Sequence, residues 1–230
     1  FAQFYRANRK DIFRSKDGVE FPVFSNGDAI RQGVGPIIGY LMAEKGLEGF
    51  ISIGRLHGEW LDGIDISAGN PEYGDDLVLL LTLLKNNGLK LQITTDGHNA
   101  NVLKSIVEKG LCDRIIMAVR GPWHLYEALS GRPIDKDALM QSIQSVCKCP
   151  EYQLFTEISA LDTGDGPRYL TPEEVAETAQ LIEEATGSKK HPYEICRVDP
   201  AQSLDALPDA ALFKYRTAAR RYMVMTEIKK

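Results

Sequence analysis

From residue 61 onward, short apolar stretches alternate with longer amphipathic ones along the chain. This alternation is typical of parallel sheets built from repeated βα units. Five of the short stretches predict strands, and a sixth candidate precedes them. In chain order, the six predicted strands cover residues 21–25, 63–68, 90–95, 114–119, 153–159 and 193–198.

The amphipathic stretches between these strands predict helices with clear ends. One should cover 75–85 and another 99–109, which ends at Gly110 because glycine adopts the left-handed conformation that closes a helix. A third should begin at Thr171 and run to about residue 186. Its first residues read TPEE, which supplies an N-cap hydroxyl, a proline at the first helical position and a reciprocal glutamate cap.

Parallel strands joined by helices bury both faces of their sheet and turn right-handed. Six such units predict an α/β fold with a parallel sheet, either an open (β/α)6 partial TIM barrel or a doubly wound sheet. We expect a single domain over 1–230, with 1–20 as an N-terminal extension and 201–230 as a C-terminal closing segment that holds a helix and an edge strand. In such folds function gathers at the C-terminal ends of the strands, here called the mouth.

The charge, the apolar runs and the cysteines of the chain each argue against particular classes of function. A net charge of −5 argues against a nucleic-acid partner, since affinity for nucleic acid depends on many cationic contacts to phosphate. No apolar run reaches the length that crosses a bilayer, so we expect no membrane partner and a cytoplasmic location. The four cysteines, Cys112, Cys147, Cys149 and Cys196, lack zinc-ribbon or CxxC spacing, and we expect reduced, buried or half-buried thiols.

The residues that follow the strands form recognisable segments. They read SAGNP at 67–71, TTDGH at 94–98 and MAVRGP at 117–122, followed by Tyr126 and by SGRP at 130–133. Together they resemble the radical S-adenosylmethionine activating enzymes, such as those that serve anaerobic ribonucleotide reductase and pyruvate formate-lyase. In that family the segments read roughly SGGEP, DTNG and MDIKGP, with a downstream tyrosine and TGxP. The order and spacing agree over about residues 21–200.

The chain departs from this family where the family's chemistry lies. The resemblance implies a CxxxCxxC loop after the first strand, whose thiolates hold a [4Fe–4S] cluster, but Asp28, Gln32 and Gly35 stand in its place. A carboxylate, an amide and a bare backbone do not replace soft thiolate ligands, so we expect no [4Fe–4S] cluster. Asn70 stands where the family has a glutamate that contacts the methionyl amino group, and Ala118 replaces an aspartate.

Polar residues near the strand ends are the candidates for a site. We expect Asp96, His98, His124 and Glu157 as catalytic candidates at the mouth. The resemblance implies a remnant of the S-adenosylmethionine site, so that S-adenosylmethionine is a possible cofactor. Two histidines with several carboxylates could instead hold a metal, but no HxH or HxxxH pairing supports this, and a polar, water-filled mouth is the favoured alternative. The cofactor-binding candidates are Ser67, Gly69, Asn70, Asp96, Arg120 and Arg197, and the full polar set adds Asp28 and Asp199.

Three further patterns carry weaker signals. His57 and Glu59 precede a strand and therefore lie at its wrong end for catalysis, and the glycines of 27–39 lack the spacing of a phosphate-binding loop. The C-terminal tail is rich in cations interleaved with aromatic and methionine residues. We interpret it as a solvated face, with a docking surface as the alternative. Its cations are Lys214, Arg216, Arg220, Arg221, Lys229 and Lys230.

The function that follows from these patterns is non-catalytic. We expect a cluster-less, radical-SAM-like pseudoenzyme that acts as a binding, scaffolding or regulatory subunit of a larger enzyme. A larger protein partner is expected because, by resemblance, activating enzymes dock on a large protein substrate. Two alternatives stay open. One is an enzyme that still binds S-adenosylmethionine or a nucleotide in its mouth. The other is an activating enzyme whose cluster is ligated from outside this chain.

Overall fold

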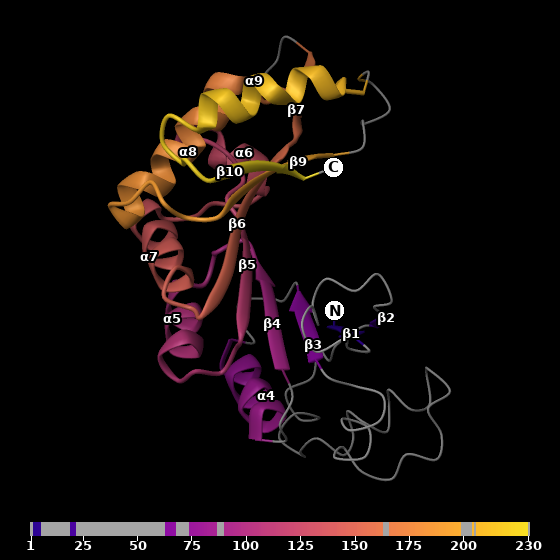
Figure 1. Cartoon of the computed structure of the whole chain (residues 1–230). Coiled ribbons are helices and arrows are strands. Elements are labelled where there is room, and N and C mark those ends of the chain that lie inside the picture. Colours follow the sequence, from indigo (N-terminus) through magenta and orange to yellow (C-terminus); the bar gives the residue numbers. More distant parts are fainter. Residues whose placement is uncertain are drawn as a thin grey trace. The chain divides into compact units, whose positions relative to one another are not determined.

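The computed structural model describes residues 2–5, 19–21, 63–67, 74–86, 90–162, 166–198, 204 and 206–229. These residues fall into two compact units, and each unit is assembled from several stretches of the chain. The first comprises 1–95, 101–115 and 149–151, and the second comprises 96–100, 116–148 and 152–230. Figure 1 labels most of the helices and strands of both units.

The first unit is built on a mixed sheet. Strands β3 and β4 pair in parallel, with Ser67 opposite Thr94, so both strands end at the same edge. β1 pairs antiparallel with β3 on one side and with β2 on the other. The elements of this unit are β1 (Ala2–Tyr5), β2 (Val19–Phe21), β3 (Gly63–Ser67), α4 (Gly74–Asn86), β4 (Lys90–Thr95), most of α5 (Ala100–Glu108) and the start of β5 (Arg114–Ala118).

Only one residue of the predicted first strand is described. We expected a parallel strand over 21–25, and Phe21 is the last residue of β2, which is antiparallel to β1. Residues 22–25 lie outside the described part of the chain, so the parallel strand stays a prediction. The antiparallel pairing of β1 with β2 was not predicted.

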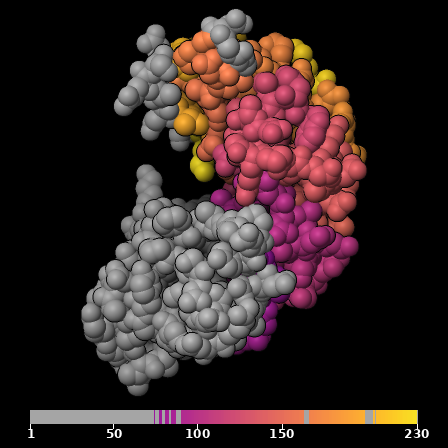
Figure 2. Space-filling view, turned by 180° about the vertical axis from the view of Figure 1, so that it is seen from behind, coloured from indigo at the N-terminus to yellow at the C-terminus, as the bar shows by residue number. Residues whose placement is uncertain are grey.

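The second unit has parallel strands covered by helices. β9 pairs in parallel with β6 and with β10, and β10 is an edge strand. From behind, the residues of this unit present the pink to yellow surface in Figure 2. Besides the end of β5, its elements are η2 (Trp123–Leu125), α6 (Tyr126–Ser130), α7 (Lys136–Val146), β6 (Glu151–Ile158), β7 (Ala160–Asp162), β8 (Pro167–Tyr169), α8 (Pro172–Thr186), β9 (Tyr193–Arg197), α9 (Asp209–Ala219) and β10 (Thr226–Lys229).

The α/β prediction is confirmed, because parallel strands alternate with helices and five of the six predicted strands form within two residues of their expected ends. The strands do not close into a barrel, since β2 and β10 are edge strands. The tail forms the expected helix and edge strand. The antiparallel β7–β8 hairpin was not predicted. The expectation of a single domain stays a prediction.

Apolar side chains on the predicted faces form the core of each unit. In the first unit Leu81, Leu91 and Ile106 are fully buried, and in the second Leu139, Ile143 and Ile195 are fully buried. Each such side chain contributes about 1.5–3 kcal/mol by leaving water. The helix at 172–186 begins as its sequence predicts, with Thr171 and Glu174 forming both hydrogen bonds of a capping box.

Among the described residues, no helix combines the length and apolarity that crossing a bilayer requires.

Candidate functional site

The turn after β4 positions two of the predicted site residues. Gly97 lies between Asp96 and His98 with φ +79°, a left-handed conformation that favours glycine. Its carbonyl accepts a hydrogen bond of 2.6 Å from the Ser142 hydroxyl of α7. A Cβ at Gly97 would overlap the end of the buried Met117 side chain. The turn therefore depends on glycine, and α7 holds it in place.

Asp96 is the centre of a charged cluster. Its Oδ2 accepts a hydrogen bond of 2.8 Å from Arg132, and its Oδ1 lies 3.0 Å from His98 Nδ1. Burial alone would raise the pKa of Asp96, but the charge of His98 and the hydrogen bonds of Arg132 and His98 outweigh burial and hold the pKa below its ordinary value. Asp96 is thus kept ionised and oriented.

Two buried polar groups near Asp96 have hydrogen-bonding capacity to spare. The His98 side chain is only 7% exposed, and its Nε2 has no hydrogen-bond partner among the described residues. The Tyr126 hydroxyl is likewise buried, and the Arg120 backbone is near enough to affect its pKa without completing a close hydrogen bond. Burial, with the negative charge of Asp96 nearby, raises the pKa of Tyr126 to about 12, although the Arg120 backbone offsets part of this. Unsatisfied buried groups of this kind are costly unless water or a ligand completes them.

A second ion pair connects the ends of β5 and β6. Arg120 donates a hydrogen bond of 2.9 Å to Glu157 Oε2, and both side chains are about one-third exposed. The strand ends are also joined by the Val119 backbone N–H, which donates to the Phe155 carbonyl. Glu157 is thus oriented by an ion pair with Arg120, and its role as a catalytic candidate stays a prediction.

Of the other predicted site residues, three are described, and the rest lie outside the described part of the chain. His124 of η2 lies 3.4 Å from Glu177 of α8, and Arg197 donates to Asp209 at the start of α9. Their assignment to a site stays a prediction. Ser67 ends β3 at the edge where β4 also ends. Asp28, Gln32, Gly35, His57, Glu59, Gly69, Asn70 and Asp199 lie outside the described residues.

Arg132 and Tyr126 belong to the cluster, but we did not select them as site residues from sequence. Both lie in the segments that carry the family resemblance, and that was the available signal. Charge and spacing gave none, because Arg132 follows Asp96 by 36 positions and the two meet only through folding.

The residues present do not fit the [4Fe–4S] cluster that the fold resemblance implies. All four cysteines are described, and no group of three or more potential metal ligands occurs among the described residues. Cys112 and Cys149 adjoin the starts of β5 and β6, whereas the candidate residues follow the strand ends. Burial raises the pKa of Cys147 to about 12 and that of Cys196 to about 11, which favours their neutral thiols.

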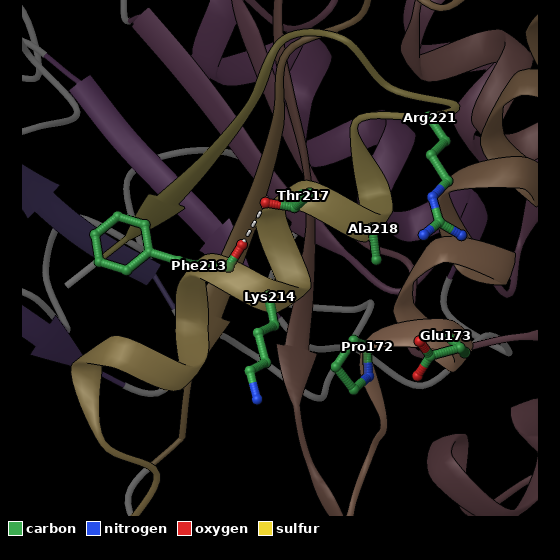
Figure 3. Close-up of a pocket in the computed structure, with 7 residues that line it drawn as sticks. All are labelled: Pro172, Glu173, Phe213, Lys214, Thr217, Ala218 and Arg221. Carbon is green, nitrogen blue, oxygen red and sulfur yellow. Dashed lines mark hydrogen bonds between the residues drawn. The ribbon is translucent and has the colours of Figure 1, made fainter.

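A groove between α8 and α9 is a second candidate site. The two helices lie side by side, and the cavity between them has a volume of about 390 Å³. In Figure 3 the side chains of Lys214 and Arg221 extend on the side of Pro172 and Glu173, while the Phe213 ring lies at the edge. The lining residues are Pro172, Glu173, Phe213, Lys214, Thr217, Ala218 and Arg221.

Neither cation of this groove has a carboxylate partner in the part of the chain that the structure describes. Among the described residues, no carboxylate forms an ion pair with Lys214 or Arg221. Phe213 is 55% exposed, and the Arg216 guanidinium lies 5.1 Å from the centre of its ring. The groove therefore combines an exposed aromatic ring with two unpaired cations.

Comparison with known proteins identifies the fold. No family model and no curated protein matches the chain. The chain is similar in structure to a domain of pyruvate-formate lyase-activating enzyme from Bacteroides vulgatus, with a TM-score of 0.54 and 10% sequence identity. The similarity covers 74% of this chain and 99% of that one. At this identity the likeness establishes a shared fold and nothing finer.

Proposed function

We propose that this chain is a binding protein that uses a radical-SAM-like fold without radical chemistry, and that it docks on an acidic segment of a larger protein through the α8–α9 groove. The observation that carries the proposal is the groove itself, where Lys214 and Arg221 lack carboxylate partners beside exposed Phe213. The similar fold of an activating-enzyme domain motivates a large protein partner.

Charge is the reason for expecting an acidic partner segment. The whole chain carries −5, yet 209–221 contains Lys214, Arg216 and two further arginines against the single carboxylate of Asp209. That carboxylate is already bound to Arg197. On an anionic protein, a local cationic surface attracts acidic segments to one face, and the negative charge of the rest of the protein repels them from the other faces.

The exposed ring supplies the apolar part of the contact. Lys214, Thr217 and Arg221 follow one another at intervals of three and four residues and so lie along one side of the helical segment, and Phe213 precedes Thr217 by four residues. Aromatic and arginine side chains are enriched among residues that dominate binding energies. An acidic segment that also carries apolar side chains would bury Phe213 and neutralise the cations together.

The loss of radical chemistry is the other half of the proposal. It rests on the residues Asp28, Gln32 and Gly35 at the positions aligned with the family's cluster cysteines. It also rests on the placement of the four cysteines of the chain, since Cys112 and Cys149 adjoin strand starts. A chain that cannot ligate the cluster retains a scaffold whose surfaces are available for binding.

Reversing the groove cations should remove partner binding while leaving the fold intact. We expect the double variant K214E/R221E to bind the partner at least about tenfold more weakly, and the residual binding to lose most of its salt dependence. Arg220 is unsuitable for this test because its Nε donates to the Thr226 carbonyl and reversal would also disturb β10.

The partner is first identified by affinity purification from the native source, and its binding to each purified variant is then titrated at several salt concentrations. The matched control is K109E/K148E, which changes net charge equally at exposed lysines outside the groove. If both double variants weaken partner binding equally, net charge alone explains the loss, and the docking proposal is contradicted. Thermal melts exclude unfolding.

A second candidate function is the binding of S-adenosylmethionine or a nucleotide at the Asp96 cluster. The observation that favours it is the pair of unsatisfied buried groups, His98 Nε2 and the Tyr126 hydroxyl, beside an ionised Asp96. A ligand with hydroxyl and amino groups would complete these hydrogen bonds.

If this second function holds, calorimetric titration with S-adenosylmethionine or with adenosine will give saturable binding. His98→Leu should weaken that binding at least about tenfold, since a buried hydrogen-bonding group is lost, which corresponds to about 1.4 kcal/mol. His124→Leu is the control, because His124 is exposed and pairs with Glu177 instead. No heat of binding with either compound would remove this candidate.

A further inference from the structure

Two cysteines that are far apart in the sequence meet in the first unit. The Sγ atoms of Cys112 and Cys149 lie 3.7 Å apart, and each residue is 4% exposed. Their separation of 37 positions in the sequence gives no sign of this contact. Folding pairs Cys149 with Cys112, because the turns before β5 and β6 come together.

We propose that Cys112 and Cys149 form an oxidisable dithiol, which a low-molecular-weight disulfide such as oxidised glutathione converts into an intrachain disulfide. The proposal goes beyond the docking function and does not depend on it. The observation behind it is the placement of two thiols in contact, held there by neighbouring contacts on both sides.

The neighbouring residues fix both halves of the pair. Arg114 lies two residues after Cys112, and Glu151 lies two residues after Cys149. The Arg114 Nε atom is 3.1 Å from Glu151 Oε1, so this ion pair is a second contact between the two segments that carry the cysteines. Asp113, adjacent to Cys112, accepts hydrogen bonds from Lys85, from Lys90 and from the Leu91 backbone N–H. The thiols therefore do not meet by chance rotation of free side chains.

Access favours Cys149 as the first thiol to react. Its turn lies at the surface, with Lys148, Pro150 and Glu151 all exposed, so a small displacement of the turn uncovers its sulfur. The Cys112 and Cys149 sulfurs share a hydrogen bond in which either thiol can donate, and the Glu151 backbone N–H also contacts the Cys149 sulfur. These contacts lower the pKa of Cys149 despite its burial. The contact between the sulfurs, together with burial, raises the pKa of Cys112. The exposed turn and these contacts make Cys149 the thiol that reacts first.

The reaction balances as two exchanges. The Cys149 thiolate attacks one sulfur of the small disulfide, which forms a mixed disulfide and expels one thiolate. Cys112 then loses its proton to water or buffer and attacks the Cys149 sulfur, which forms the Cys112–Cys149 bond and expels the second thiolate. Two protein thiols are oxidised, and one small disulfide is reduced to two small thiols.

Oxidation should change stability as well as thiol content. The new bond would close the chain between the start of β5 and the start of β6, a stretch that contains α6 and α7. Cross-links that close loops of this length restrict the unfolded chain and stabilise the folded state. The oxidised protein should therefore melt at a higher temperature, and excess dithiothreitol should reverse the increase.

The test is incubation of the folded, reduced protein with oxidised glutathione, followed by thiol titration in denaturant and peptide mapping. We expect the free thiols to fall from four to two, with no glutathione retained. Trypsin cuts after Lys148 and so separates Cys147 from Cys149, which lets the map assign the bond. The expected product joins the peptide 110–114 to the peptide 149–168.

Variants separate the proposed pair from the other thiols. C112S should trap glutathione on Cys149, whereas C147S and C196S should still lose two thiols. A map that shows another pairing would overturn the proposal. It would also be overturned if the folded wild-type protein kept all four thiols under conditions that oxidise the denatured chain. The wild-type map decides the matter even if a serine variant fails to fold.

Discussion

Replacing Gly97 by alanine should destabilise the protein by about 3 kcal/mol, the largest effect we expect from any single methyl group in the described chain. Two costs combine at this position. A left-handed φ of +79° costs a non-glycine residue about 1–2 kcal/mol, and forcing a methyl group against buried Met117 adds about 1–3 kcal/mol. Ser142 Cβ would lie 3.3 Å from the added methyl group, so the methyl group cannot move toward α7 to avoid Met117.

Gly110→Ala is the matched control, because it separates backbone strain from overlap. Gly110 has φ +63°, but a Cβ there meets nothing within 4 Å, so we expect a loss of about 1 kcal/mol. Urea denaturation of both variants measures the difference. Equal losses for the two variants would mean that Met117 moves aside freely and that α7 does not constrain the turn.

Because Gly97 lies between Asp96 and His98, the same substitution tests how the polar cluster depends on the turn. A displaced turn would separate Asp96 from Arg132, which reaches it from the segment after α6. The pKa of Asp96 should then rise toward its ordinary value, since burial is no longer opposed by the same partners. Titration of Asp96 followed by NMR in the wild type and in Gly97→Ala would show the change.

The secondary structure was predictable because it is encoded locally. Strand β4 and helix α8 formed at their expected positions, since an apolar run fixes the first and a capping box fixes the start of the second. The β7–β8 hairpin was missed because each of its strands has three residues, which are too few to show the alternation of apolar and polar side chains that marks a strand.

The candidate sites were predictable only in part, because a side chain's partner is set by the tertiary fold. Asp96 was expected at the mouth, but its partner Arg132 could not be chosen among the arginines of the chain. In the same way, the sulfur of Cys149 contacts that of Cys112, 37 positions earlier in the chain, and no sequence pattern marks the two as partners. The contact of His124 with Glu177 of α8 could not be chosen from the sequence either, and the place of His124 among the site residues stays a prediction.

The groove illustrates what composition does and does not reveal. The run of cations after Phe213 was visible in the sequence, with a solvated face as the favoured interpretation. That interpretation could not anticipate that α9 would pack along α8 and enclose a cavity with Pro172 and Glu173. A docking surface thus requires two helices that are separated by more than twenty residues in the chain.

Anaerobic reconstitution with iron and sulfide should leave the isolated chain colourless. A [4Fe–4S] cluster of the activating-enzyme kind takes three thiolates from one loop, whereas here only Cys112 and Cys149 are in contact among the described residues. Cys147 and Cys196 are half-buried thiols whose pKa values are raised by burial, so neither provides a ready third ligand.

Iron and sulfide analysis after desalting measures the outcome, alongside the visible absorbance of the protein. The double variant C112S/C149S is the control, because any iron held loosely by the thiol pair would disappear with it. A stoichiometric brown cluster in the isolated wild type would contradict the pseudoenzyme proposal outright. Colour that forms only when a second purified protein is added would instead favour the alternative in which ligands from outside this chain hold the cluster. Docking and radical chemistry would then belong to one assembly, and K214E/R221E should abolish the colour together with the binding.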